Sequence, residues 1–210
     1  QKLFDSDKIR IENRALGGRS SRTFLTQGLW AAVSKNLKPG DFVMMQFGHN
    51  DNGKPEGEPG KEGRASLPGN RENSRVIEAA NGKKERVQSF GWYLRHFIAD
   101  AKAKGATPIV LSMVPRNRWE NGKVMRADAR HGGWAKEAAT QGGAIFVDLN
   151  EIIAQKYEEM GEETVGKLFP KEYTHTGPEG AELNARMVVK GLRALPQNPL
   201  AAYLKADAAQ

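Results

Sequence analysis

A short apolar run that stops abruptly at a glycine constrains the fold more than any other feature of the sequence. Residues 42–46 are Phe-Val-Met-Met-Gln, and Gly48 is then followed by the polar side chains of His49, Asn50 and Asp51. A strand that is apolar on both faces is typical of a parallel sheet covered by helices, and such sheets place their sites at the carboxyl ends of the strands. We therefore expect the three polar side chains at a functional edge. A polar turn after a core strand is the alternative interpretation.

The rest of the chain alternates between strand-like and helix-like patterns. Strands are predicted at residues 9–13, 42–46, 107–114 and 144–148. Helices are predicted at residues 23–34, 89–104, 134–141, 149–160 and about 178–195. Because helices separate the strands, the pattern predicts parallel βαβ units with right-handed crossovers. The expected fold class is α/β, a three-layer α/β/α sandwich with a parallel sheet.

Two polar stretches, residues 52–86 and 115–133, interrupt this alternation. The first is rich in Gly, Glu, Lys and Asn and is longer than a usual structureless connection. We expect it to be a long surface loop or a hairpin, either functional or mobile.

Composition excludes several classes of function. The net charge of +7 favours acidic partners such as nucleic acid, anionic lipid or polyuronate, but the basic residues are scattered. No basic helix or RNP-like aromatic motif is present, so we expect no nucleic-acid partner. The absence of cysteine excludes disulfides, thiolate zinc sites and thiol nucleophiles. No run approaches the ~18 apolar residues that span a bilayer, so we expect no membrane insertion, and the oligomeric state stays unknown.

Each of the four histidines is a candidate general base. His96 falls beside core positions of a predicted helix, and we expect it to be structural. His131 lies in the second polar stretch before two glycines, so we expect it to be exposed and able to touch a substrate. His49 and His175 are the stronger candidates.

His175 stands just before a predicted helix that Pro178 opens at a favoured position. Glu172, three residues earlier, can fold back to accept the Nδ1 proton, which leaves Nε2 as the base. A solvated glutamate and a capping histidine are the alternative.

The glycine pair Gly17-Gly18 lies between a predicted strand and a predicted helix. It lacks the Gly-Lys-Ser/Thr of a P-loop and the full dinucleotide glycine spacing, which weakens the case for a nucleotide-binding α/β domain. The unshielded N–H of Gly18 and the amide of Asn50 can instead serve a developing oxyanion, as in acyl transfer.

Three ordered blocks carry a resemblance to a known family. They are Asn-Arg-Ala-Leu-Gly-Gly-Arg-Ser-Ser-Arg-Thr-Phe at 13–24, Phe-Gly-His-Asn-Asp at 47–51 and Glu-Tyr-Thr-His-Thr at 172–176. Together they resemble blocks of the SGNH (GDSL-type) hydrolases, most closely the rhamnogalacturonan acetylesterases. The resemblance covers nearly the whole chain and implies a flavodoxin-like SGNH hydrolase fold. It implies oxyanion donors at Gly18 and Asn50, a general base at His175, an acid at Glu172, and no metal or cofactor.

The nucleophile of that family is not found in this sequence. The family's Gly-Asp-Ser block, at the end of the first strand, is absent. Asp5-Ser6 is no replacement, because no sufficient strand precedes it and it lies too close to Gly18. We expect Ser20 and Ser21 to cap or pack near the next helix.

This absence leads to two expectations about the chain. We expect residues 1–195 to be an N-terminally truncated SGNH hydrolase-like domain without its first strand, followed by a tail at 196–210 that is a short helix or frayed. We also expect a longer natural protein that carries the serine, and an inactive chain as given. A second departure from the family is Glu172 in place of aspartate, a substitution that other hydrolases tolerate.

The function implied by the resemblance is that of a carbohydrate esterase, which removes acetyl groups from pectic, rhamnogalacturonan-like or related polysaccharides. Its partner is an acetylated polysaccharide or oligosaccharide, and its location is secreted or periplasmic. Arg116, Arg118 and Arg130 can pair with uronate carboxylates, and His131 is a further candidate for substrate binding. The alternative is a non-catalytic carbohydrate-binding relative of the same fold.

Overall fold

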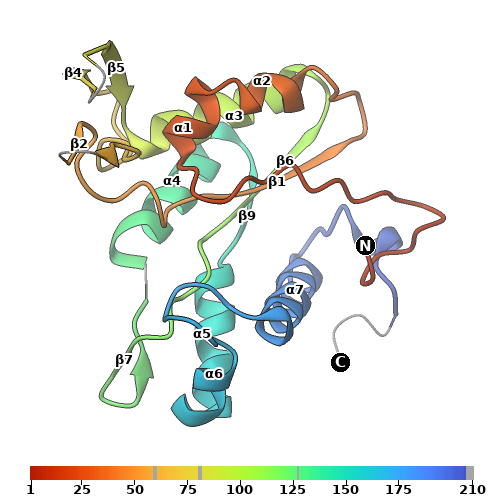
Figure 1. The fold of residues 1–210 in the computed structure, drawn as a ribbon. Coiled ribbons are helices and arrows are strands. Elements are labelled where there is room, and N and C mark those ends of the chain that lie inside the picture. Colours follow the sequence, from red (N-terminus) through yellow and green to blue (C-terminus); the bar gives the residue numbers. More distant parts are fainter. Residues whose placement is uncertain (59–60, 80–81, 127, 207–210) are drawn as a thin grey trace. The chain divides into compact units, whose positions relative to one another are not determined.

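The computed structural model describes residues 1–58, 61–79, 82–126 and 128–206 (Figure 1). The chain divides into two compact units, which we describe separately. The sheet unit comprises Arg14–Met113 and Asp128–Phe146, and the helical unit comprises Gln1–Asn13, Val114–Ala127 and Val147–Gln210.

A parallel sheet forms the centre of the fold. Its strands are β1 (Phe42–Gln46), β6 (Thr107–Leu111) and β9 (Ile145–Val147), in the order β1-β6-β9. β1 and β6 pair in parallel, with Phe42 opposite Thr107 and Gln46 opposite Leu111. The α/β class and the strand at 42–46 are thus confirmed, while β6 and β9 are shorter than predicted.

The α-helices described in the sheet unit are α1 (Ser21–Thr26), α2 (Leu29–Ser34), α3 (Phe90–Ala103) and α4 (Gly133–Gly142). Figure 1 shows α1 and α2 lying along α3, which also packs against α4 and β6. The core between them is rich in aromatic rings, with Trp30 and Phe97 at a centroid distance of 4.7 Å. The Ser89 hydroxyl caps α3 by accepting from the Trp92 N–H at 3.1 Å.

The single helix predicted at residues 23–34 is wrong, because Gly28 divides it. Gly28 has a φ of +75°, in the left-handed region that glycine adopts readily. This conformation ends α1 at Thr26 and lets α2 begin at Leu29.

The first polar stretch contains two hairpins, so the expected hairpin is confirmed. β2 (Gly57–Glu58) pairs with β3 (Lys61–Glu62), and β4 (Ser74–Glu78) pairs with β5 (Lys84–Gln88), both antiparallel. The second hairpin is not a free loop, because a small apolar cluster anchors it: Leu67, Ile77 and Val87.

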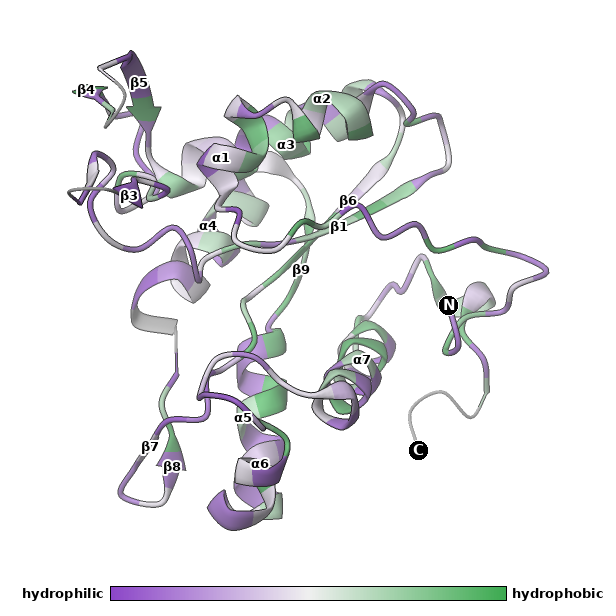
Figure 2. Cartoon of the chain, in the orientation of Figure 1, coloured by the Kyte–Doolittle hydropathy of each residue, from purple (hydrophilic) through white to green (hydrophobic). Residues whose placement is uncertain are grey.

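Within the described residues, the helical unit contains further helices and another hairpin. Its elements are β7 (Trp119–Glu120), β8 (Lys123–Val124), α5 (Leu149–Met160), α6 (Glu162–Lys167), α7 (Pro178–Arg193) and the 3-10 turn η2 (Ala201–Tyr203). The helix predicted at 149–160 is confirmed, and α6 was not predicted. α5 and α7 pack together, and the Tyr157 hydroxyl donates to Asn184 at 3.0 Å. Figure 2 shows hydrophobic and hydrophilic residues on different sides of α7.

The strand predicted at residues 9–13 is wrong. The side-chain amide of Gln1 takes the hydrogen-bonding place of a neighbouring strand: its Nε2 donates to the Ile9 carbonyl at 3.0 Å, and its Oε1 accepts from the Ile11 N–H at 2.7 Å. The segment is therefore bound locally and forms no sheet ladder.

The tail described up to residue 206 pairs with the beginning of the chain. Phe4 and Leu204 form an antiparallel bridge, and the Asp5 N–H donates to the Tyr203 carbonyl at 2.8 Å. Of the two forms expected for the tail, a short helical turn is the one observed at Ala201–Tyr203. No helix within the described ranges is long and apolar enough to cross a membrane.

Candidate functional site

Strand β1 reaches the candidate site through Gly48. This residue has a φ of +143°, and a Cβ added to it would lie 2.6 Å from Met113 Sδ and 3.3 Å from His131 Cβ. Both the backbone conformation and the space therefore favour glycine. The turn at Gly48 directs residues 49–51 away from the path of the strand.

Asn50 contacts the glycine loop of residues 17–19 directly. Its Nδ2 donates to the carbonyl of Arg19 at 3.2 Å. Since Arg19 follows Gly18, the structure brings the two predicted oxyanion donors to the same region. An asparagine side chain has two N–H donors, so Asn50 can hold the loop and also face an oxyanion.

Gly18 is held in a left-handed conformation by a neighbouring arginine. Its φ is +76°, and its carbonyl accepts from Arg64 Nη1 at 2.9 Å. An added Cβ would lie 3.1 Å from the same nitrogen. The Ser20 hydroxyl donates in turn to the Arg64 carbonyl at 2.5 Å, so the glycine loop and residue 64 are bonded at two points.

Ser20 and Ser21 are both buried, as expected for capping or packing groups. Ser20 is the N-cap of α1: its hydroxyl accepts from the Thr23 N–H at 3.0 Å, and Thr23 Oγ1 accepts from the Ser20 N–H at 2.8 Å. The Ser21 hydroxyl donates to Asp51 at 2.5 Å. The predicted capping and packing roles are confirmed.

Asp51, the last of the three polar side chains after β1, is a buried carboxylate. It accepts from the hydroxyl and the backbone N–H of Ser21, the latter at 3.2 Å to each carboxylate oxygen. Burial raises the pKa of Asp51 to about 6, and the hydrogen bonds from Ser21 oppose that rise. The sequence signal was the carboxylate that directly follows a buried strand end.

In the helical unit, Glu172 and His175 form the pair that their spacing predicts. Glu172 Oε1 lies 2.6 Å from His175 Nδ1 and accepts from the His175 backbone N–H at 2.6 Å, while Oε2 accepts from the Thr174 N–H at 2.8 Å. Desolvation acts to raise the pKa of Glu172, but the N–H groups of His175 and Thr174 and the imidazole lower it to about 2. The contact is confirmed, and its catalytic role stays a prediction.

The imidazole of His175 is open to solvent, with its side chain 85% exposed. When the Nδ1–H group of the neutral ring donates a hydrogen bond to the carboxylate, Nε2 carries no proton and can accept one. This is the tautomer that a general base requires.

The loop that contains His175 is fixed just upstream of the histidine. The Asn117 N–H donates to the carbonyl of Tyr173 at 2.8 Å. The guanidinium carbon of Arg118 lies 4.1 Å from the centroid of the Tyr173 ring, and that of Arg116 lies at 6.0 Å. Tyr173 is itself exposed, and its contacts with the two arginines are a feature of this loop that the sequence did not predict.

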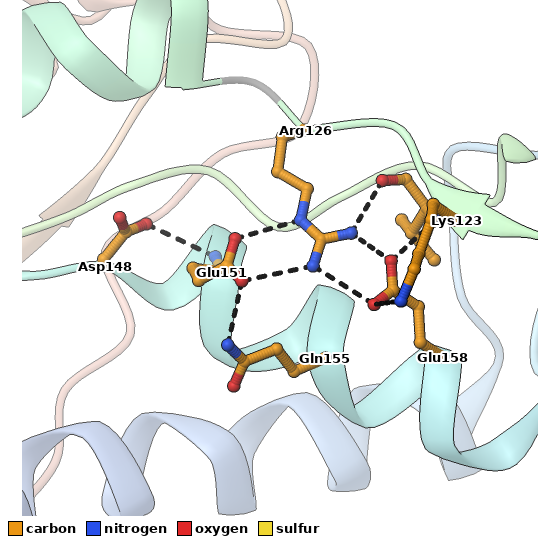
Figure 3. A network of polar contacts seen from close by, with 7 residues as sticks. Lys123, Arg126, Asp148, Glu151, Gln155 and Glu158 are labelled. Atoms are coloured by element: carbon orange, nitrogen blue, oxygen red, sulfur yellow. Dashed lines mark hydrogen bonds and ion pairs between the residues drawn. The ribbon is translucent and has the colours of Figure 1, made fainter. Parts of the chain in front are cut away.

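The hairpin that follows these arginines is fastened to α5 (Figure 3). Arg126 Nε donates to Glu151 at 2.9 Å, and its Nη1 donates to the Val124 carbonyl at 2.8 Å and to Glu158. The Val124 N–H also donates to Glu158 at 2.9 Å. Hydrogen bonding by Arg126 lowers the pKa of Glu158 to about 2.

The expectation that His131 is exposed is wrong. Its side chain lies between Phe90 and Trp134, with both ring centroids 4.9 Å from its own, and it is only 4% exposed. It lies in the turn Asp128–Gly132, whose backbone is kinked at Arg130, with a φ of −139° and a ψ of −109°. Burial lowers its pKa to about 4.

His96 has a structural environment, as expected. Its ring stacks on Trp92 at a centroid distance of 5.2 Å, and its Nε2 lies 3.6 Å from Asp100. Within the described ranges, no three His, Cys, Asp or Glu side chains gather as metal ligands.

The similarity to known proteins identifies the family. No protein-family model matches the chain. The chain is 33% identical over 190 residues to the rhamnogalacturonan acetylesterase of Emericella nidulans, which covers 90% of this chain and 76% of that protein. The chain belongs to the rhamnogalacturonan acetylesterase family. It is also 31% identical over 198 residues to the probable rhamnogalacturonan acetylesterase YesY of Bacillus subtilis, covering 90% of the chain and 79% of that relative.

A solved structure agrees with this assignment. The crystal structure of YxiM from Bacillus subtilis matches with a TM-score of 0.70 and 26% identity over 91% of this chain. The chain spans 48%, about half, of that longer protein, and a curated relative of the same name is an uncharacterized esterase. The predicted SGNH-type α/β fold and the family of carboxylic ester hydrolases are thereby confirmed, and the relatives support a carbohydrate esterase function.

Proposed function

We propose that this chain supplies the general base, the orienting acid and the oxyanion donors of a serine acetylesterase that acts on rhamnogalacturonan-like pectic polysaccharides. The observation that carries the proposal is the 2.6 Å contact between Glu172 and His175 Nδ1 on an exposed loop. The names of the relatives support the substrate class.

The proposed reaction has two halves. In the first, His175 Nε2 takes the proton of a serine hydroxyl as its oxygen bonds to the acetyl carbon, and the N–H groups of Gly18 and Asn50 stabilise the oxyanion. The ester C–O bond then breaks, and His175 returns the proton to the sugar oxygen. In the second half, water attacks the acetyl-serine with the same base, which releases acetate and restores the serine. Glu172 stabilises the imidazolium throughout.

The serine in this scheme belongs to a Gly-Asp-Ser block, a triplet that the 210-residue sequence does not contain. We propose that this chain alone is inactive for that reason. Assays therefore compare the chain with the native product of its gene.

The first experiment measures acetate release from acetylated rhamnogalacturonan by the native gene product. His175→Ala is expected to lower kcat by about 1000-fold or more, and Glu172→Gln by about 100-fold or more, because the base is lost or misoriented. Glu172→Asp tests the residue that the family has at this position and should retain more activity than Glu172→Gln. His96→Gln is the matched control, and its kcat should stay within about threefold of the unmodified protein. Unchanged activity in His175→Ala would contradict the proposal.

A second proposal concerns the sugar. Arg116 and Arg118 lie beside Tyr173, two residues from His175, and no carboxylate of the described chain pairs with either guanidinium. The Nε of Arg116 is buried without a hydrogen-bond partner. These features support pairing with a uronate carboxylate, because an unpaired buried donor is unfavourable until a ligand meets it. Arg130, which is exposed in the sheet unit, is a weaker candidate for the same role.

The test compares acidic with neutral acetylated oligosaccharides. Arg116→Gln and Arg118→Gln should lower kcat/KM about tenfold or more for the acidic substrate and much less for the neutral one. Lys167→Gln, which removes an exposed positive charge on α6, is the control for net charge. An equal loss on both substrates would argue against uronate recognition.

The alternative function is that of a non-catalytic carbohydrate-binding relative, and the absence of Gly-Asp-Ser from this sequence favours it. In that case the native gene product would bind the oligosaccharide without serine-dependent turnover. From the family resemblance we also propose a secreted or periplasmic location, which fractionation of the source organism would test.

A further inference from the structure

The contact between Asp51 and Ser21 joins two loops that are 30 residues apart in sequence. Ser21 is the first residue of α1 and follows the glycine loop, while Asp51 directly follows Asn50. Both residues are buried. Three short contacts connect them, from one hydroxyl and one backbone N–H to both carboxylate oxygens.

The chemistry of this contact depends on a carboxylate. Asp51 accepts the Ser21 N–H with both oxygens while Oδ1 also accepts the hydroxyl, and an asparagine has only one acceptor oxygen. Hydrogen bonds to an ionised acceptor are about twice as strong as neutral ones. A buried carboxylate is unfavourable unless its hydrogen bonds compensate, so a merely packed loop would not need one.

We propose that Asp51 and Ser21 are positioning residues, which hold the N–H of Gly18 and the amide of Asn50 in register as a pair of oxyanion donors. The inference rests on the proposed function of that pair. The Asn50 bond to Arg19 fixes one side of the glycine loop, and the Asp51 bond to Ser21 fixes the other. Arg64 also holds the loop, through the Gly18 carbonyl and the Ser20 hydroxyl, but only the Ser21 bond ties the loop directly to the residue that follows Asn50.

The kinetic test uses Ser21→Ala and Asp51→Asn in the native gene product. Displacement of an oxyanion donor acts on the transition state, so kcat should fall about tenfold to 100-fold while KM stays within about twofold. Ser21→Thr retains the hydroxyl and should recover part of the loss. The matched control is Ser89→Ala, because Ser89 is also a buried serine that caps a helix, α3, and its hydroxyl bonds Arg71 and Trp92, away from the glycine loop. Its thermal midpoint should fall by at least as much as that of Ser21→Ala, but its kcat should stay within about threefold.

A spectroscopic test does not depend on catalysis. In a ¹⁵N-labelled His49→Gln background, the Gly18 amide and the Asn50 side-chain amide should shift with pH around a midpoint near 6, and Asp51→Asn should remove that shift. Among the ionisable groups nearby, Arg22 and Glu85 form an ion pair with each other, and burial raises the pKa of Tyr93. The pKa of His131 is about 4.

The outcomes separate the positioning role from the proposed function. If kcat falls no further in Ser21→Ala than in Ser89→Ala, or if the loss lies in KM alone, the positioning role is overturned. Amide signals of Gly18 and Asn50 that do not respond to Asp51 would overturn it as well. An unmodified protein without esterase activity would refute the proposed function, while a midpoint near 6 in both amides would still support the coupling of the two loops.

Discussion

Arg22 and Glu85 form a bidentate ion pair, with Arg22 Nε donating to Oε1 at 2.8 Å and Nη2 donating to Oε2 at 2.6 Å. The arginine is buried on α1, and the glutamate lies on β5. Arg22 Nη1 donates in addition to the carbonyls of Pro55 and Ala65 at 2.8 and 2.9 Å. The first polar stretch thus supports the helix that begins beside the glycine loop.

Glu85→Ala is expected to destabilise the protein by about 3 kcal/mol, because it leaves the buried guanidinium of Arg22 without its counter-charge. Urea unfolding gives the measurement. Glu72→Ala, which removes an exposed partner of Arg95, is the control and should change stability by less than about 1 kcal/mol. The double variant Arg22→Met with Glu85→Leu should be more stable than Glu85→Ala. Equal stability of the Glu85→Ala and Glu72→Ala proteins would show that the pair is unimportant.

Gly48→Ala is expected to destabilise the protein by about 1–3 kcal/mol through backbone strain, with a further loss from contact with Met113. Gly53→Ala is matched to it, because Gly53 also has a positive φ, of +106°, but has open space around it. The difference between the two variants in thermal unfolding isolates the contact. A smaller loss of stability in Gly48→Ala than in Gly53→Ala would show that Met113 does not crowd a side chain at position 48.

His131 should make stability depend on pH. Its folded pKa of about 4 is below the ordinary 6.5, so the unfolded chain binds more protons between these values. Its contribution is full above pH 6.5 and decreases by about 2–3 kcal/mol as the pH falls toward 4. Asp51 contributes with the opposite sign, because its raised pKa favours the folded state as the pH falls from 6 toward 4. His131→Leu should therefore be compared with the unmodified protein in denaturant unfolding at pH 7.5 and 4.5, where the variant should lose less stability.

Glu158 should contribute to acid unfolding in a lower range of pH. Its folded pKa of about 2 is below the ordinary 4.5, so its stabilising contribution is present above pH 4.5 and is lost as the pH falls toward 2. Arg126→Met removes the main cause of the lowered pKa, so the free energy of unfolding should depend less steeply on pH in this range. Circular dichroism between pH 5 and 2 measures the slope. Lys167→Met, on the exposed pair with Glu163, should leave it unchanged.

The sequence predicted correctly the strands and helices whose hydrophobic pattern lies entirely within the element itself. The apolar run at 42–46 and the helical spacing at 149–160 needed no distant partner to be recognised. The strand predicted at 9–13 is not formed, and two of its backbone groups, the Ile9 carbonyl and the Ile11 N–H, bond the side chain of Gln1 outside the segment. The helix at 23–34 failed because one glycine conformation outweighed the periodicity.

The candidate site was predictable only where its parts are neighbours in sequence. Glu172 and His175 are three residues apart, and their contact follows from that spacing. The bond between Ser21 and Asp51 and the burial of His131 among aromatic rings depend on residues far away in the chain. Such contacts leave no periodic signal, which explains why His131 was expected to be exposed.

The contacts of Tyr173 explain how a solvent-exposed loop can hold a side chain in a defined position. Its carbonyl is fixed by Asn117 and its ring lies under Arg118, while His175 follows only two residues later. Because only two residues separate the fixed Tyr173 from His175, motion of the loop displaces the imidazole only slightly. The imidazole of His175 can therefore be exposed to solvent and still be well positioned, because its exposure is a property of residue 175 whereas its position is fixed by the contacts of Tyr173.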